Sequence, residues 1–185
     1  MAEKANQFGQ FNLKKEVIDA LSAIGFYEPT AVQAKLIPDV LQGRDVVGQS
    51  QTGSGKTHTF LIPILNQLEQ DNEYVQAVIT TPSRELAAQI TKAMKEFSNQ
   101  LNTDISISEF VGGTDKQRQI KQLENHQPQI VIGTPGRIKD LVESGSLKLH
   151  AVHTLVVDEA DMTLDMGFLN EVDYIAGAMP EGLQT

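Results

Sequence analysis

The chain has 185 residues, 40% of them hydrophobic, which is typical of one globular domain and excludes a disordered chain. Its net charge of −9 argues against a free-standing, non-specific nucleic-acid binder, because such domains are usually basic. It contains no cysteine, which excludes disulfides and thiolate metal sites and suits a reducing compartment. No signal peptide and no apolar run long enough to span a bilayer is visible. We therefore expect a cytoplasmic protein without membrane contact.

Residues 1–43 predict two helices that precede the rest of the fold. Asn12 is the expected N-cap of the first helix, in which apolar residues recur at helical spacing. Thr30 is the expected cap of the second helix, which Pro38 is predicted to interrupt. We expect this segment to be a separate helical part of the chain, followed by an α/β domain over residues 44–185.

A glycine-containing loop before a helix predicts a phosphate-binding site. Val46 and Val47 read as the end of a buried strand, and small or polar residues follow. Glycines let backbone N–H groups turn inward, and the helix N-terminus adds partial positive charge. In this layout Lys56 reaches the β- and γ-phosphates and the Thr57 hydroxyl ligates Mg²⁺. The alternative is a chance glycine turn. The expected phosphate contacts are Gln51, Thr52, Gly53, Ser54, Gly55, Lys56 and Thr57.

The remaining chain alternates between strands and helices. Strands are predicted at residues 75–80, 105–111, 129–132 and 152–157, and each is followed by a helical stretch. This alternation is the signature of a parallel sheet covered on both faces, so we predict a doubly wound α/β fold. Ligand sites in such sheets lie at the carboxyl ends of strands, and every candidate functional stretch here follows a strand.

Two carboxylates, Asp158 and Glu159, follow the buried strand 152–157 directly. A carboxylate at the end of such a strand is costly unless it meets a cation or hydrogen-bond donors. Beside a phosphate loop, Asp158 is the expected outer ligand of Mg²⁺, and Glu159 would orient or deprotonate the attacking water. The alternative is a helix N-terminus that simply favours acidic residues.

Asp158-Glu159-Ala160-Asp161 spells the DEAD box, and nearly the whole chain resembles the first RecA-like domain of a DEAD-box RNA helicase, with bacterial members the most similar. Ser50 stands where the family usually has Gly or Ala, and Ser83 where it usually has Thr; both replacements are small. The other elements occur in the family's order: Phe8 with Gly25-Phe26-x-x-Pro29-Thr30-x-x-Gln33 (Q motif), Ser50–Thr57 (motif I), Pro82–Ala87 (motif Ia), Gly112-Gly113 (GG element) and Thr134–Arg137 (motif Ib).

The resemblance implies a role for each of these residues. Gln33 would read the edge of the adenine of ATP through its amide, and Phe8 would stack on the base. Lys56, Asp158 and Glu159 would be catalytic, with Mg²⁺ held at Thr57 and Asp158. The RNA sugar-phosphate backbone would be contacted without base readout, and therefore independently of sequence, by Arg84, Gly113, Thr134 and Arg137.

The family continues with a Ser-Ala-Thr element on the next strand, and then with a second RecA-like domain. We expect that strand to belong between the strand of Val46 and Val47 and residues 152–157, and its position to be left open in this chain. This chain stops at Thr185, before both. The resemblance therefore implies the ATP-binding half of an ATP-dependent RNA helicase, which unwinds short duplexes with its second domain and is nearly inactive alone. One alternative is a nucleotide-responsive RNA-binding adaptor module without turnover. Another is a different P-loop motor such as a DNA translocase, against which Gln33 and its flanking residues argue.

Overall fold

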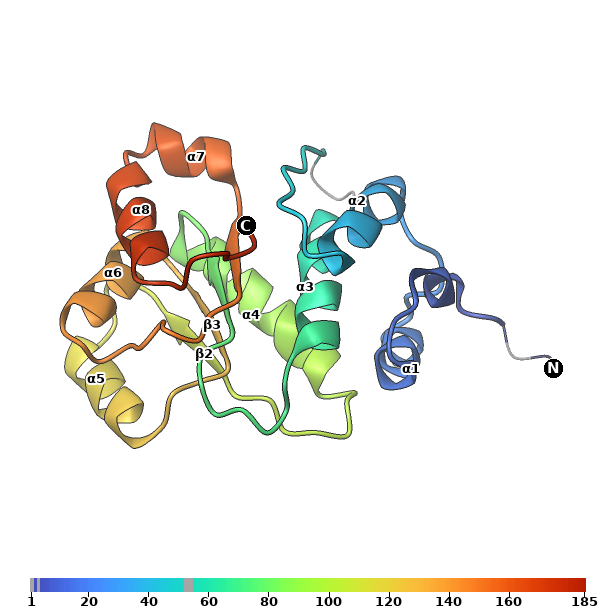
Figure 1. Ribbon diagram of the computed structural model, residues 1–185, viewed down its shortest axis with the longest axis horizontal. Coiled ribbons are helices and arrows are strands. Elements are labelled where there is room, and N and C mark those ends of the chain that lie inside the picture. The colour runs from blue at the N-terminus through green and yellow to red at the C-terminus, as the bar shows by residue number, and fades with distance from the viewer. Residues whose placement is uncertain (1, 3, 52–54) are drawn as a thin grey trace. The chain divides into compact units, whose positions relative to one another are not determined.

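The computed structural model describes residues 2, 4–51 and 55–185 (Figure 1). The chain forms two compact units. The first comprises Met1–Leu68 with Ala93–Asp104, and the second comprises Glu69–Lys92 with Ile105–Thr185. The boundary between them passes through helix α4 (Arg84–Ser98), whose first half belongs to the second unit.

The first unit is helical in its described residues. Helix α2 packs on α3, and α1 contacts α3 as well. Fully buried side chains from each element form the core, among them Phe8, Leu21, Ile37 and Leu61. The elements are the 3-10 helix η1 (Gln7–Phe11), α1 (Lys15–Ala23), α2 (Ala31–Leu41), α3 (Lys56–Gln67) and the end of α4.

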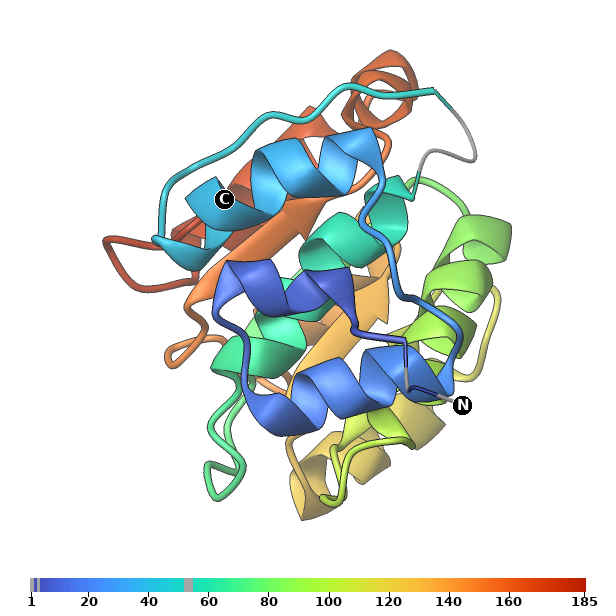
Figure 2. The same ribbon diagram turned by 90° about the vertical axis from the view of Figure 1, so that its right-hand side faces the viewer.

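Three local predictions for this unit are wrong. Asn12 does not cap α1; it ends η1 in a left-handed conformation (φ 59°), and Lys14 precedes α1 instead. Pro38 does not interrupt α2, because it lies inside a helix that continues to Leu41. Residues 44–51 form neither helix nor strand, and Val47 is 99% exposed, so the buried strand expected at Val46 and Val47 is absent from the described residues. Figure 2 shows this segment running alongside α2.

The second unit is built on a four-stranded parallel sheet with strand order β2-β3-β1-β4. Val78 pairs with Val131 on one side and Leu155 on the other, which places all three on the same face. The strands are β1 (Ala77–Thr80), β2 (Ile107–Phe110), β3 (Ile130–Gly133) and β4 (Thr154–Val157). Because every pairing is parallel, the carboxyl ends of all four strands meet at one edge.

Helices α5, α6 and α8 share one hydrophobic core with the Val78 face of the sheet (Figure 1). Ile138 from α6 and Ile175 from α8 are fully buried in that core, and α6 packs directly on α8. The opposite face is also buried, with Ile79 and Ile132 at 0% exposure. Helix bounds are α5 (Lys116–Asn125), α6 (Pro135–Glu143), α7 (Ala160–Asp165) and α8 (Leu169–Gly177).

The chain returns to the sheet after α8. Gln184 forms a parallel bridge with Thr154: the Leu155 N–H donates to its carbonyl at 2.9 Å, and its own N–H donates to the His153 carbonyl at 3.1 Å. Because β1 occupies the other edge of β4, this bridge lies on the outer edge of β4. The position beside β4 that we expected to be open is thus partly filled, because Gln184 pairs with it.

Candidate nucleotide and RNA site

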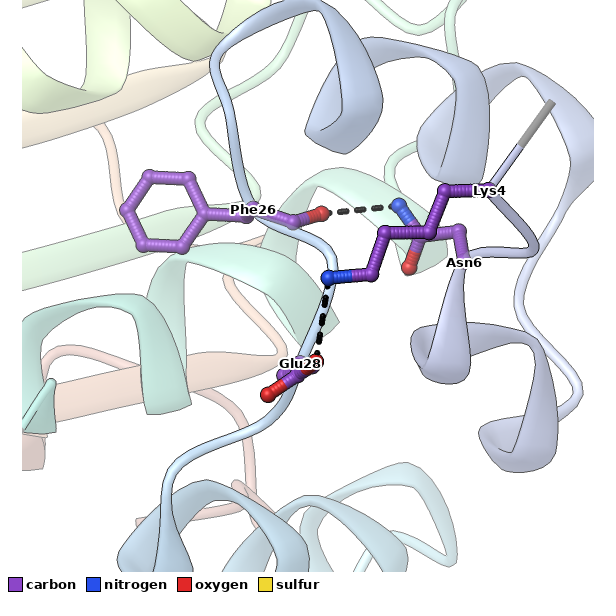
Figure 3. Close-up of polar contacts among 4 residues, drawn as sticks. All are labelled: Lys4, Asn6, Phe26 and Glu28. Carbon is purple, nitrogen blue, oxygen red and sulfur yellow. Dashed lines mark hydrogen bonds and ion pairs between the residues drawn. The ribbon is translucent and has the colours of Figure 1, made fainter. Parts of the chain in front are cut away.

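Hydrogen bonds hold the N-terminal segment against the loop that leads to α2 (Figure 3). The Asn6 amide nitrogen donates to the Phe26 carbonyl at 2.7 Å and to the Ser22 hydroxyl at 2.8 Å, while its oxygen accepts from the Phe8 N–H at 2.9 Å. The Lys4–Glu28 ion pair at 3.1 Å joins two exposed side chains and therefore adds little stability. Asn6 and the Gln7 N–H, which donates to the Tyr27 carbonyl at 2.8 Å, both join the N-terminal segment to this loop.

Gln33 is fully buried at the start of α2, and its amide is bonded at both ends. Its Oε1 accepts from the Thr30 N–H at 2.9 Å, which completes a capping box, and its Nε2 donates to the Gly55 carbonyl at 3.1 Å. A Cβ on Gly55 would lie 2.7 Å from that Nε2. Gln33 thus ties α2 to the residue immediately before Lys56. The Gln33 amide nitrogen has a second N–H and its oxygen a second lone pair. Hydrogen bonding of these groups to adenine therefore stays a prediction.

The structure contradicts the stacking role predicted for Phe8. Its side chain is 0% exposed, and its ring lies against Phe11 with 6.0 Å between the ring centroids. A ring that is enclosed by its own core offers no face to a nucleotide base. Phe26 is half-buried, and its ring lies against His58 of α3 with 4.4 Å between the ring centroids and 35° between the ring planes.

Gly55, in the predicted phosphate loop, has a φ of 84° and directly precedes α3. Lys56 and Thr57 form the first turn of that helix, where N–H groups and the helix dipole favour anions. Both side chains are half-buried, and Gln51 is exposed. The predicted contacts Thr52, Gly53 and Ser54 lie outside the described residues.

Burial lowers the pKa of two histidines, His58 in the first unit and His153 in the second, although Glu96 and Glu69 respectively act in the opposite direction. Each then binds fewer protons when folded than when unfolded, so folding stability is lost as pH falls through the unfolded pKa. We expect the urea midpoint to decrease between about pH 7.5 and pH 5.5. His58→Phe keeps an aromatic ring at this position and should reduce that slope. An unfolding midpoint that is constant across this range contradicts the prediction.

Asp158 and Glu159 lie at the carboxyl end of β4, in the second unit. Asp158 is 8% exposed, and its N–H donates to the Thr80 carbonyl at 2.8 Å. Glu159 has a left-handed backbone (φ 51°), which costs a non-glycine residue roughly 1–2 kcal/mol and is typical of functional positions. The Thr163 N–H and hydroxyl hold it by donating to its carbonyl at 3.0 and 3.1 Å. Nothing in the amino-acid sequence marks Glu159 as a strained position.

The oxygen ligands that Asp158 and Thr57 could supply are of the kind that Mg²⁺ prefers, which is carboxylates together with phosphates and water. Asp158 supplies a nearly buried carboxylate, and Thr57 supplies a hydroxyl. Among the described residues no group of three or more His, Asp or Glu side chains forms a protein-only metal cage.

The residues predicted to contact RNA all lie at the carboxyl edge of the sheet in the second unit. Arg84 begins α4 after β1, Gly113 lies in the turn after β2, and Thr134 and Arg137 open α6 after β3. Gly113 has a φ of 77°, and a Cβ there would lie 2.6 Å from the Arg84 guanidinium. Thr134 donates its N–H to the Phe110 carbonyl at 3.1 Å. Arg84, Arg137 and the backbone of Gly113 therefore lie after three neighbouring strands of the sheet, β1, β3 and β2.

Comparison with known proteins decides the family. The family model described as DEAD/DEAH box helicase matches residues 30–185. The chain belongs to this family. It is 54% identical over 181 residues to the DEAD-box ATP-dependent RNA helicase CshB of Listeria monocytogenes, covering 98% of this chain and 41% of that protein. It is 50% identical over 182 residues to CshB of Bacillus subtilis, with the same coverage of both chains.

Solved structures of DEAD-box proteins share this fold. A DEAD box protein from Methanococcus jannaschii gives a TM-score of 0.88 at 37% identity, covering 96% of this chain and 48% of that one. Dbp5 of S. cerevisiae, bound to RNA and ADP BeF3, gives 0.85 at 28% identity, covering 98% and 45%. The fold is therefore that of a RecA-like P-loop NTPase domain, as predicted. This DEAD-box chain spans about two fifths of the length of the CshB relatives.

No helix in the described part of the chain is both long and apolar enough to cross a membrane.

Proposed function

We propose that this chain is the ATP-binding and RNA-binding part of an ATP-dependent RNA helicase. The observation that carries the proposal is the carboxyl edge of the parallel sheet, where the Asp158–Glu159 pair follows β4 and the arginines follow β1 and β3. Contacts from Arg84, Gly113, Thr134 and Arg137 go to the RNA backbone, so binding is independent of base sequence. The RNA-bound relative Dbp5 supports this class of ligand.

In this proposal the residues divide the chemistry among themselves. Lys56 and the N–H groups of the first turn of α3 bind the β- and γ-phosphates of ATP. Thr57 and Asp158 would be ligands of Mg²⁺, which would neutralise charge that develops on the phosphates. Glu159 accepts the proton of, or orients, the attacking water. Its strained backbone, held by Thr163, keeps that carboxylate at a fixed place directly after β4.

The rest of the enzyme is part of the proposal. We propose that a second RecA-like domain of the same protein completes hydrolysis and duplex unwinding, in keeping with the length of the CshB relatives. Within this chain, residues 1–43 would be the helical Q-motif segment and residues 44–185 the RecA-like ATP-binding domain. We place the protein in the cytoplasm, consistent with the absence of cysteine from its sequence.

Nucleotide choice tests the proposal. We expect ATP to bind at least about tenfold more tightly than GTP, because an unpaired buried amide costs about 1–3 kcal/mol. Gln33→Glu keeps an acceptor for the Thr30 N–H but loses the amide donor. This variant should therefore keep α2 and lose the preference for adenine. Calorimetry with ATP, ADP, AMP and GTP measures both effects, and equal wild-type affinities for ATP and GTP would refute the Q-motif assignment.

A measurement of ATP hydrolysis distinguishes the proposed helicase from the alternative of an adaptor without turnover. We expect this chain alone to hydrolyse ATP very slowly with or without RNA, because an arginine supplied by another domain can contribute roughly 10³–10⁵ in rate. Adding the second domain should restore RNA-stimulated phosphate release. RNA-stimulated turnover by this chain alone would contradict the prediction. No turnover even with the second domain would favour a nucleotide-responsive adaptor.

A further inference from the structure

Arg137 is held in place by the protein at one end of its guanidinium group. Its Nη1 donates to Gln119 Oε1 at 2.8 Å, to the Thr114 carbonyl at 3.1 Å and to the Thr114 hydroxyl at 3.4 Å. The residues come from the turn after β2, from α5 and from α6, all in the second unit. Three acceptors on one nitrogen define the direction in which the rest of the guanidinium points.

The orientation of the Gln119 amide follows from the same network. The Thr114 hydroxyl donates its single proton to the Val111 carbonyl at 2.6 Å, so it can only accept from Gln119 Nε2, at 2.8 Å. This leaves Oε1 as the end that faces Arg137. Gln119 is 8% exposed, which excludes most competing water from the contact. The amide is therefore a fixed acceptor rather than a mobile surface group.

The opposite edge of the Arg137 guanidinium stays open. In the described parts of the chain, Nε and Nη2 have no hydrogen-bond partner, and the side chain is only half-buried. Nε and Nη2 form one of the two-donor edges with which arginine binds phosphate oxygens side by side. Because the protein's acceptors bind only Nη1, the Nε–Nη2 edge of Arg137 keeps both of its donors for a ligand.

We propose that Gln119 is a positioning residue for RNA: it anchors Nη1 of Arg137 so that the Nε–Nη2 edge meets a phosphate of the RNA backbone. This inference rests on the proposed function. Gln119 itself does not contact RNA. It holds the long Arg137 side chain in one conformation before RNA binds, so that less conformational entropy is lost on binding. Its neutrality is essential, because a carboxylate in the same place would anchor Arg137 but cancel the charge that attracts phosphate.

Binding of a single-stranded oligouridylate, followed by fluorescence anisotropy at several salt concentrations, tests the inference. Gln119→Leu should weaken binding about 2- to 10-fold, the cost of ordering one rotamer-rich side chain. In the Arg137→Ala background the same substitution should have no further effect. Gln119→Glu should weaken binding too, and should lower the salt slope by about 0.7, as for one lost phosphate contact. The matched control Gln117→Leu makes the same chemical change at an exposed position of α5 and should leave affinity unchanged.

A second readout does not depend on RNA affinity. NMR of the Arg137 side chain reports rotation about its Cζ–Nε bond, which should speed up in Gln119→Leu and stay slow in Gln119→Glu. The glutamate variant then shows a firmer anchor with weaker RNA binding, a combination that a purely structural role would not produce. Unchanged rotation in Gln119→Leu, or an equal loss of affinity in the Arg137→Ala background, would overturn the positioning role alone. If Arg84→Ala and Arg137→Ala leave affinity unchanged, the RNA site itself is wrong.

Discussion

Lys56→Ala should lower the affinity for ATP and ADP by about 10- to 100-fold, because a charged hydrogen bond to phosphate contributes about 1.5–3 kcal/mol. Lys56 begins α3 directly after Gly55, where the helix N-terminus already favours an anion. The lysine adds a full positive charge to that partial charge. Adenosine, which has no phosphate, should bind the variant and the wild type equally well.

The control for this experiment is Lys35→Ala. Lys35 lies on α2 in the same unit and is exposed, so its removal changes the net charge equally without touching the phosphate loop. Calorimetry should show ATP affinity unchanged in this variant. An equal loss of affinity in both variants would mean that only long-range charge matters. No loss in Lys56→Ala would mean that the loop does not bind the polyphosphate.

The family and the fold class could be predicted because their signals are local. The glycine loop, the carboxylates after a buried strand and the alternation of strands and helices need no knowledge of tertiary contacts. The parallel sheet and the shared edge that carries Arg84, Gly113 and Arg137 follow directly from that alternation.

Side-chain exposure was not predictable, because it depends on contacts between distant residues. Phe8 carries the right ring in the right motif, yet Asn6 and Phe11 hold its segment inside the helical unit, where the ring has no free face. The hydrogen bonds of Gln33 were not predictable either, because its amide donates to the carbonyl of Gly55, 22 residues away in the sequence. A motif specifies which residue is present, and the surrounding core decides which atoms are accessible.

Backbone conformation was the second feature that could not be predicted from the sequence. Val46 and Val47 have strong β propensity, but in the described parts of the chain residues 44–51 form no strand, and Val47 is 99% exposed. The left-handed conformations of Asn12 and Glu159 were missed for a related reason. Asn tolerates that region and could have been recognised as a helix end, whereas nothing marks a glutamate as strained before its contacts are known.

Gly133→Ala should cause the largest loss of stability of any variant considered, about 3 kcal/mol or more, because it forces overpacking against rigid backbone. Gly133 ends β3 opposite Phe110 of β2, and a Cβ there would overlap the Phe110 carbonyl oxygen and lie 3.2 Å from Ile138. That same carbonyl accepts from the Thr134 N–H. Pushing β2 away would therefore break this hydrogen bond and displace the turn that carries Gly113.

Gly136→Ala is the matched control, three residues further along the same segment. Gly136 lies in α6, and a Cβ added there would have no neighbouring atom within 4 Å, so alanine should leave stability unchanged or raise it by up to about 1 kcal/mol. Urea unfolding measures both variants, and a loss of 3 kcal/mol corresponds to a Tm lower by about 6–12 °C for a chain of this size. RNA affinity should fall with Gly133→Ala, because the turn that carries Gly113 is displaced. Equal stability of the two variants would show that β2 can move without cost, and that the Phe110–Gly133 contact does not position the RNA-binding edge.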